Sequence, residues 1–324
     1  MTYKKYGINT YNALLFLFSI TIFYLMYLVR DTIQDRPNYL EHFTYPVDTI
    51  KIEIGFKYYM KLFNILGIDP QISICLTSVF IYILLAKVWY KYVSKLNSIE
   101  SILIFNFIML TLFNHYVGTS IRMGLAIAIA LYSSMKIIEG NKKYWIMIFL
   151  SIFFHYGISL FVLLFTWVKL FEKRSIRFHL FSLILIFLLT FIIFYWAVPI
   201  LEFLNNEQRY SHYFDGKDMT DRIMPFTLLF LIGSLFLLLI KRSEQWSILY
   251  LLVGYSIPFI IVIVIIKVNI LPKMLMPLIF LSAVLIINSY RFEYIKLNGI
   301  IRFNLLIIAN VVAIMYALKM YQYY

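Results

Sequence analysis

Apolar residues form long runs along the 324-residue chain, and short polar segments separate these runs. A helix that crosses a hydrocarbon layer about 30 Å thick needs about 20 mostly apolar residues, and the runs approach this length. The runs are Thr10–Val29, Gln71–Tyr90, Ile99–Tyr116, Ile121–Ile138, Tyr144–Trp167, Phe178–Pro199, Ile223–Ile240, Trp246–Ile266, Met274–Tyr290 and Phe303–Leu318. They predict an all-α, polytopic integral membrane protein with about 10 to 11 transmembrane helices in a single domain, residues 1–324.

Two of the polar segments are unusually long, namely residues 30–70 and residues 200–222. Within the first, the stretch Glu53–Leu66 has apolar residues at helical spacing, with Lys57 and Lys61 among them. This pattern is typical of an amphipathic helix that lies at a membrane interface and does not cross the bilayer.

Lysine and arginine residues predict the orientation of the chain, because they favour the cytoplasmic side. The run Tyr144–Trp167 has basic residues before it and after it, so a simple crossing would place one basic cluster outside. A re-entrant hairpin that enters and leaves on the cytoplasmic side keeps both clusters inside, with its tip at His155, Tyr156 and Gly157. We therefore predict this hairpin, with the N-terminus in the cytoplasm.

This topology also explains the formal net charge of +13. Its cytoplasmic segments carry 17 Lys or Arg and 5 acidic residues, whereas its outer segments carry 12 and 11. With 62% hydrophobic and 14% charged residues, the chain differs from soluble globular proteins. The positive charge is therefore interpreted as an orientation signal, and nucleic acid is not a predicted partner.

Charged and imidazole groups beside apolar helices are costly, so they are candidates for function. Arg122 lies at the outer start of a run and follows Gly118, Thr119 and Ser120. A permanently charged guanidinium beside a helix N-terminus suits a phosphate or carboxylate, although an arginine here also suits simple snorkelling to the interface. His155 at the predicted tip is either a proton carrier or a core histidine whose ring nitrogens have hydrogen-bond partners within the protein.

The outer loops supply further candidates, in which no spacing rule selects a catalytic residue. These candidates are Asp35, Tyr39 and Glu53 in the first loop, Arg209 and Tyr210 in the second, and Lys273 before a late run. Motifs for a P-loop, a zinc protease, a dinucleotide fold or a hydrolase nucleophile are absent from the sequence. Neither a metal nor a cofactor is predicted.

The order of several short motifs resembles the EpsG-like group of Wzy-type polysaccharide polymerases. The motifs are Arg30 followed by Asp35-x-x-x-Tyr39, then Glu53-x-Gly55-Phe56, then the stretch 121–126 (IRMGLA), then the stretch 154–157 (FHYG). Met123 replaces the glutamine that is usual in this group, and Lys273 stands where an arginine tends to precede a late span.

The resemblance implies a metal-independent glycosyltransferase with a GT-C-like membrane architecture, acting in O-antigen, lipopolysaccharide or capsule biosynthesis. Such proteins lie in the bacterial inner membrane and join lipid-linked oligosaccharide repeat units on its outer face. The glycan leaves a polyprenyl (undecaprenyl) diphosphate carrier and is transferred to a hydroxyl of an acceptor sugar. A chain-length regulator and a flippase of the same pathway are possible partners besides membrane lipid.

This chemistry assigns roles to the candidate residues. Arg122, with Lys273 or Arg209, would stabilise the diphosphate leaving group. Asp35, Glu53 and His155 are candidates for the general base. Two other functions stay open, namely a transporter or flippase for lipid-linked sugars and a membrane O-acyltransferase that modifies a glycan.

Overall fold

The computed structural model describes residues 2–28, 36–44, 52–93, 96–111, 115–204, 247–266, 274–289 and 299–322. Within these ranges the secondary structure is helical, and no strand occurs. The predicted all-α class is therefore confirmed for the described part of the chain. The predicted run 223–240 and the candidates Asp35, Arg209, Tyr210 and Lys273 lie outside the described residues.

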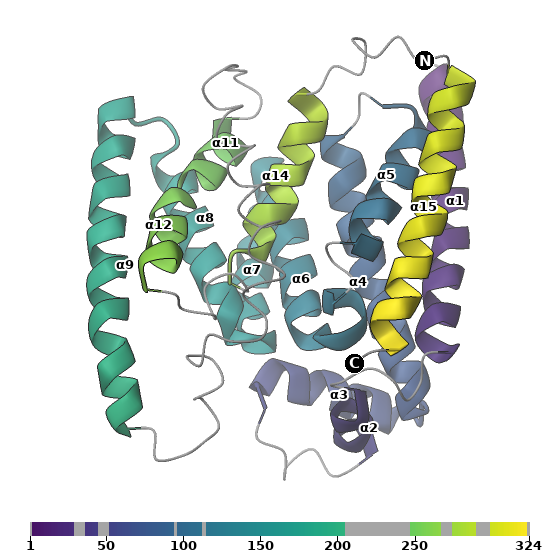
Figure 1. Ribbon diagram of the computed structural model, residues 1–324, viewed down its shortest axis with the longest axis horizontal. Helices are drawn as coiled ribbons and strands as arrows, with labels where there is room; N and C mark the ends of the chain where they lie inside the picture. The colour runs from purple at the N-terminus through teal and green to yellow at the C-terminus, as the bar shows by residue number, and fades with distance from the viewer. Residues whose placement is uncertain are drawn as a thin grey trace. The chain divides into compact units, whose positions relative to one another are not determined.

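The helices form two compact units, of which the first contains residues 1–158 and 292–324. Its elements are α1 (Thr2–Leu28), α2 (Arg36–Thr44), α3 (Ile54–Ile65), α4 (Pro70–Tyr92), α5 (Ser98–Thr111), a π-helical turn η2 (His115–Thr119), α6 (Ile121–Ile138), α7 (Tyr144–Phe154), a short 3₁₀ turn η3 (Tyr156–Ile158) and α15 (Gly299–Gln322). In Figure 1, α1, α4, α5 and α15 run along one another, and α2 and α3 lie at the end where α1 stops and α4 begins.

The second unit contains residues 159–291. Its helices are α8 (Ser159–Phe171), α9 (Ile176–Leu204), α11 (Ser247–Gly254), α12 (Ile257–Ile266) and α14 (Met276–Ser289). The side chain of His179 in α9 is within hydrogen-bond distance of the Tyr255 hydroxyl, at 3.0 Å. The single run predicted at Trp246–Ile266 forms two helices, α11 and α12, because the helix is interrupted at Tyr255 and Ser256.

Among the residues that the structure describes, three helical segments are long and apolar enough to cross a membrane: Thr10–Leu28, Pro70–Tyr92 and Ile121–Ile138. Each coincides with a predicted run, and α6 has the predicted bounds. The run predicted at Ile99–Tyr116 is different, because its helix α5 ends at Thr111 and η2 begins at His115. These spans support a membrane protein, whereas the full count of transmembrane helices stays a prediction.

Helix α2 was not predicted, because its sequence is polar and lacks an amphipathic stripe. A signal was nevertheless present. Asp35 precedes the helix and Pro37 falls in its first turn, and both residue types favour a helix start.

The amphipathic helix predicted over Glu53–Leu66 is confirmed as α3, which covers Ile54–Ile65. Phe56 and Met60 are fully buried on one face, whereas Tyr58 and Leu62 are exposed on another. A helix with two apolar faces suits a position between the protein and lipid. Its location at the membrane interface stays a prediction.

Buried amide groups attach the last helix to the first unit. The Asn106 side chain in α5 donates to Oδ1 of Asn310 in α15 at 2.8 Å, and Asn310 donates to the carbonyl of Leu103 at 3.0 Å. The Tyr82 hydroxyl of α4 donates to Asn106 at 3.3 Å. Because polar groups away from water need partners, these contacts specify which helix faces meet.

The helix break predicted at the hairpin tip is present. Helix α7 ends at Phe154, His155 has an extended backbone, η3 follows, and α8 begins at Ser159.

Whether the chain turns back toward the cytoplasm is tested by cysteine labelling in a Cys75→Ala background. We expect cysteines placed at positions 142 and 170 to react only with reagent from the cytoplasmic side. Reaction of either position from outside would contradict the re-entrant hairpin.

Candidate functional site

Glu53 is placed by the start of α3. Its backbone is extended, with φ −60° and ψ 137°, and it is the last residue before the helix. The helix is anchored by the buried Phe56 and by Tyr59, whose hydroxyl lies 2.9 Å from the Thr77 hydroxyl of α4. Packing along the whole helix thus determines where the Glu53 carboxylate lies.

Arg122 is the second residue of α6, and the turn before that helix is held tightly. Ser78 of α4 donates to the carbonyl of Val117 at 2.6 Å. A Cβ atom at Gly124 would overlap the carbonyl oxygen of Tyr116, so only glycine allows α6 to pass so close to η2. The backbone of Arg122 is therefore held in place, which limits where its guanidinium can lie.

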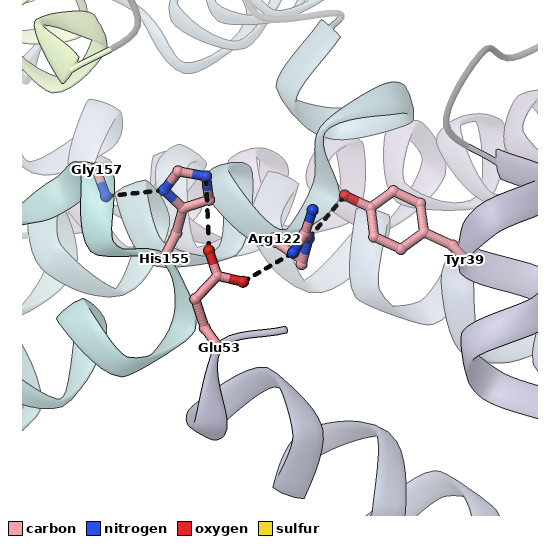
Figure 2. A network of polar contacts seen from close by, with 5 residues as sticks. All are labelled: Tyr39, Glu53, Arg122, His155 and Gly157. Carbon is pink, nitrogen blue, oxygen red and sulfur yellow. Dashed lines mark hydrogen bonds and ion pairs between the residues drawn. The ribbon is translucent and has the colours of Figure 1, made fainter. Parts of the chain in front are cut away.

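The Arg122 guanidinium joins two segments from the first predicted loop (Figure 2). Its Nη1 donates to Oε2 of Glu53 at 2.8 Å, and its Nε donates to the hydroxyl of Tyr39 at 3.3 Å. The guanidinium carbon lies 5.7 Å from the centre of the Tyr39 ring, within cation–π range. Arg122 is thus oriented by partners that are 69 and 83 residues away along the chain.

His155 approaches the same carboxylate from the end of α7. Its Nε2 lies 3.9 Å from Oε1 of Glu53, and its Nδ1 accepts a hydrogen bond from the Gly157 amide at 3.0 Å. In Figure 2 the imidazole and the guanidinium flank Glu53, each near one carboxylate oxygen. The carboxylate therefore lies between the guanidinium of Arg122 and the imidazole of His155.

His42 of α2 is a second histidine near the site, and the sequence did not indicate it. Burial lowers the pKa of His42, the positive charge of Arg122 lowers it further, and Glu41 acts in the opposite direction. A lowered pKa keeps this imidazole neutral at neutral pH. His42 therefore adds no second positive charge beside Arg122.

The site is sheltered yet reachable from solvent. The side chain of Glu53 is 12% exposed, that of Arg122 is 30% exposed and that of His155 is 32% exposed. Across the described ranges, no group of three or more His, Cys, Asp or Glu side chains is arranged to hold a metal ion. The arrangement provides a fixed cation for an anion, a carboxylate that can accept a proton and an imidazole that can donate a hydrogen bond.

Four of the residues proposed from the sequence, Tyr39, Glu53, Arg122 and His155, come together in the first unit. Their roles stay predictions. Gly157, whose amide donates to His155, is a further residue of the site, and no role is predicted for it above. The repeated spacing Glu53-x-Gly55, Arg122-x-Gly124 and His155-x-Gly157 was a signal for it.

The fold and the site define a helical membrane protein with an arginine–glutamate–histidine cluster at one end of its first unit. A sequence model of the EpsG family matches residues 4–324. The chain therefore belongs to the EpsG family, a family of Wzy-like polysaccharide polymerases. No curated protein and no solved structure gives a significant match.

Proposed function

We propose that this protein joins polyprenyl-diphosphate-linked oligosaccharide repeat units at the outer face of the bacterial inner membrane. In each step an acceptor sugar hydroxyl bonds to the anomeric carbon of the donor glycan. The bond from that carbon to the diphosphate breaks, and its electron pair leaves with the diphosphate oxygen. The observation that carries the proposal is the cluster of Arg122, Glu53 and His155 in a member of this family.

Arg122 suits the diphosphate because its donors are only partly used. A guanidinium has five N–H donors in a fixed fork, and two of them serve Glu53 and Tyr39. Nη2 has no partner among the residues that the structure describes. It is free to donate to a phosphate oxygen, and the 30% exposure of the side chain leaves it accessible. A permanent cation here would stabilise the leaving charge without a divalent metal ion.

The proposal that the site lies at the outer face of the membrane is supported by the distribution of charge and by chain connectivity. In the topology that the basic residues predict, the outer segments include the end of α1, the helices α2 and α3, and the N-terminal ends of α4 and α6. Tyr39, Glu53 and Arg122 come from these segments, so the proposed site opens where translocated lipid-linked units would arrive.

The decisive experiment uses the purified full-length protein in lipid nanodiscs. Lipid-linked oligosaccharides are extracted from cells of the same strain that lack this protein, and these are incubated with it. We expect a ladder of products that increase by one repeat unit. Units that are unchanged in a nanodisc but are moved across the membrane of a proteoliposome would instead show a transporter. An added acyl group without a ladder would show an O-acyltransferase.

A further inference from the structure

The hydrogen bond to His155 identifies which ring nitrogen carries the proton. The backbone amide of Gly157 is a donor only, and it lies 3.0 Å from Nδ1. Nδ1 is therefore the acceptor and carries no hydrogen in this arrangement. In a neutral imidazole the proton must then be on Nε2, the atom that faces Oε1 of Glu53. His155 presents a donor to the carboxylate and has no lone pair free to accept a proton.

Glycine at position 157 is what allows this contact. A Cβ atom there would lie 2.9 Å from Nδ1 and 3.0 Å from Cε1 of the His155 ring. Such distances are too short for ordinary contacts, so any larger residue would displace the imidazole. The displaced group is the end of a side chain and not backbone, so the fold should tolerate the change.

A second glycine determines how close the carboxylate comes to the imidazole. A Cβ atom at Gly55 would lie 2.8 Å from both the carbonyl carbon and the carbonyl oxygen of Phe153. The start of α3 therefore rests directly on the last turn of α7. Glu53 lies two residues before Gly55, and His155 lies two residues after Phe153. The backbone contact thus maintains the separation of their side chains.

The two side chains are spaced so that one hydroxyl can bridge them from beside the line that joins Nε2 and Oε1. Nε2 and Oε1 are 3.9 Å apart, which is too long for a direct hydrogen bond. One oxygen atom can nevertheless lie within hydrogen-bond distance of both atoms. Oε2 is already held by Arg122, whereas the described residues supply Oε1 with no hydrogen bond.

We propose that the acceptor sugar hydroxyl binds across this gap, with Glu53 as the general base and His155 as a positioning residue. The inference rests on the proposed function. The hydroxyl donates to Oε1 and accepts a hydrogen bond from the Nε2–H group of His155. As the hydroxyl oxygen bonds to the anomeric carbon, its proton passes to Oε1, and the diphosphate leaves with the electron pair of the broken bond. His155 stays neutral throughout.

The first test reads the protonation of His155 directly and needs no activity. The full-length protein is labelled with ¹⁵N-histidine in nanodiscs, and the signals of His155 are assigned by their loss in His155→Gln. At neutral pH we expect an unprotonated Nδ1 and a protonated Nε2. A proton on Nδ1, or an imidazolium, would overturn the inference.

The second test compares two amide replacements in the ladder assay. Glutamine places its amide nitrogen near the position of Nε2, whereas asparagine places it near Nδ1. We expect His155→Gln to retain about 10-fold more activity than His155→Asn, the order of magnitude that one hydrogen bond contributes, because only glutamine keeps a donor near the position of Nε2. Equal losses in both variants would contradict a donor role at Nε2.

Gly157→Ala provides a third variant, with Tyr156→Ala as its control, since Tyr156 is an exposed neighbour in the same turn. We expect Gly157→Ala to fold, to change the ¹⁵N signals of His155 and to lose activity, whereas Tyr156→Ala should fold and leave both the signals and the activity unchanged. Unchanged signals and activity in Gly157→Ala would overturn the inference. If the wild-type protein makes no ladder, the proposed function fails, whereas the ¹⁵N result still decides the state of His155.

Discussion

Replacing Arg122 with alanine is expected to abolish polymer formation while the protein still folds and inserts in the membrane. Removing one preorganised donor from a developing negative charge typically slows an enzyme by about 10²–10³-fold. Arg122 also orients the carboxylate of Glu53 through a 2.8 Å ion pair, so a loss at the upper end of this range is expected. Polymer length on gels from cells that express the variant, together with its abundance in membranes, measures both effects.

Two further variants separate lost chemistry from lost stability. Arg122→Ala leaves a sheltered carboxylate without its partner, and an uncompensated charge destabilises a fold. The double variant Arg122→Ala/Glu53→Gln removes that charge, so we expect it to regain stability without regaining activity. Lys61→Ala is the matched control, because Lys61 is an exposed cation of α3 outside the cluster. Polymer of normal length from Arg122→Ala would rule out an anion-binding role.

Arg122→Lys should recover only part of the activity. A lysine keeps the positive charge, but it cannot contact Tyr39, Glu53 and a phosphate through a planar fork. Full activity in this variant would show that charge alone is needed at this position and that the geometry around Tyr39 does not matter.

Glu53→Gln should lower the turnover rate by about 10²–10⁴-fold, the range typical of a positioned general base. Glutamine has nearly the same shape and still offers one oxygen as an acceptor for Arg122, but it is not a base. Because Arg122 remains to bind the diphosphate, we expect kcat to fall much more than KM for the lipid-linked donor changes. Initial rates in nanodiscs over a range of donor concentrations measure this separation.

The control for this variant is Glu41→Gln, which removes an exposed carboxylate from α2. Glu41→Gln should leave both constants unchanged. If Glu53→Gln polymerises at the wild-type rate, the proton of the acceptor goes to another group, and Asp35 becomes the leading candidate for the general base.

A double-mutant cycle between Glu53 and Arg122 should be strongly non-additive, because the two side chains share one ion pair.

The glycines near the site show how much a sequence pattern can reveal. Glycine follows Glu53, Arg122 and His155 at the same spacing of two residues, which is visible in the sequence. The reason for each glycine is different, and at two of the three positions it depends on a tertiary neighbour. At Gly55 the neighbour is the backbone of Phe153, at Gly124 it is the carbonyl of Tyr116, and at Gly157 it is the imidazole of His155.

Local patterns predicted the elements that hydropathy and helix periodicity determine. The long apolar runs of α1, α4 and α6 were predicted because a bilayer demands about 20 apolar residues in one stretch. The amphipathic α3 and the helix break at His155 were also predicted. Helix α2 was missed, because a short polar helix is stabilised by contacts with its neighbours and not by its own pattern.

The sequence by itself determined that this protein is a helical membrane protein of the EpsG family, with Arg122, Glu53 and His155 as candidates among several. Hydropathy, charge bias and motif order are local properties, so they can be read along the chain. Only the tertiary structure decided that Arg122 pairs with Glu53 and that His155 lies 3.9 Å from the same carboxylate. Distances between residues far apart in sequence depend on how helices pack, and no local pattern specifies them.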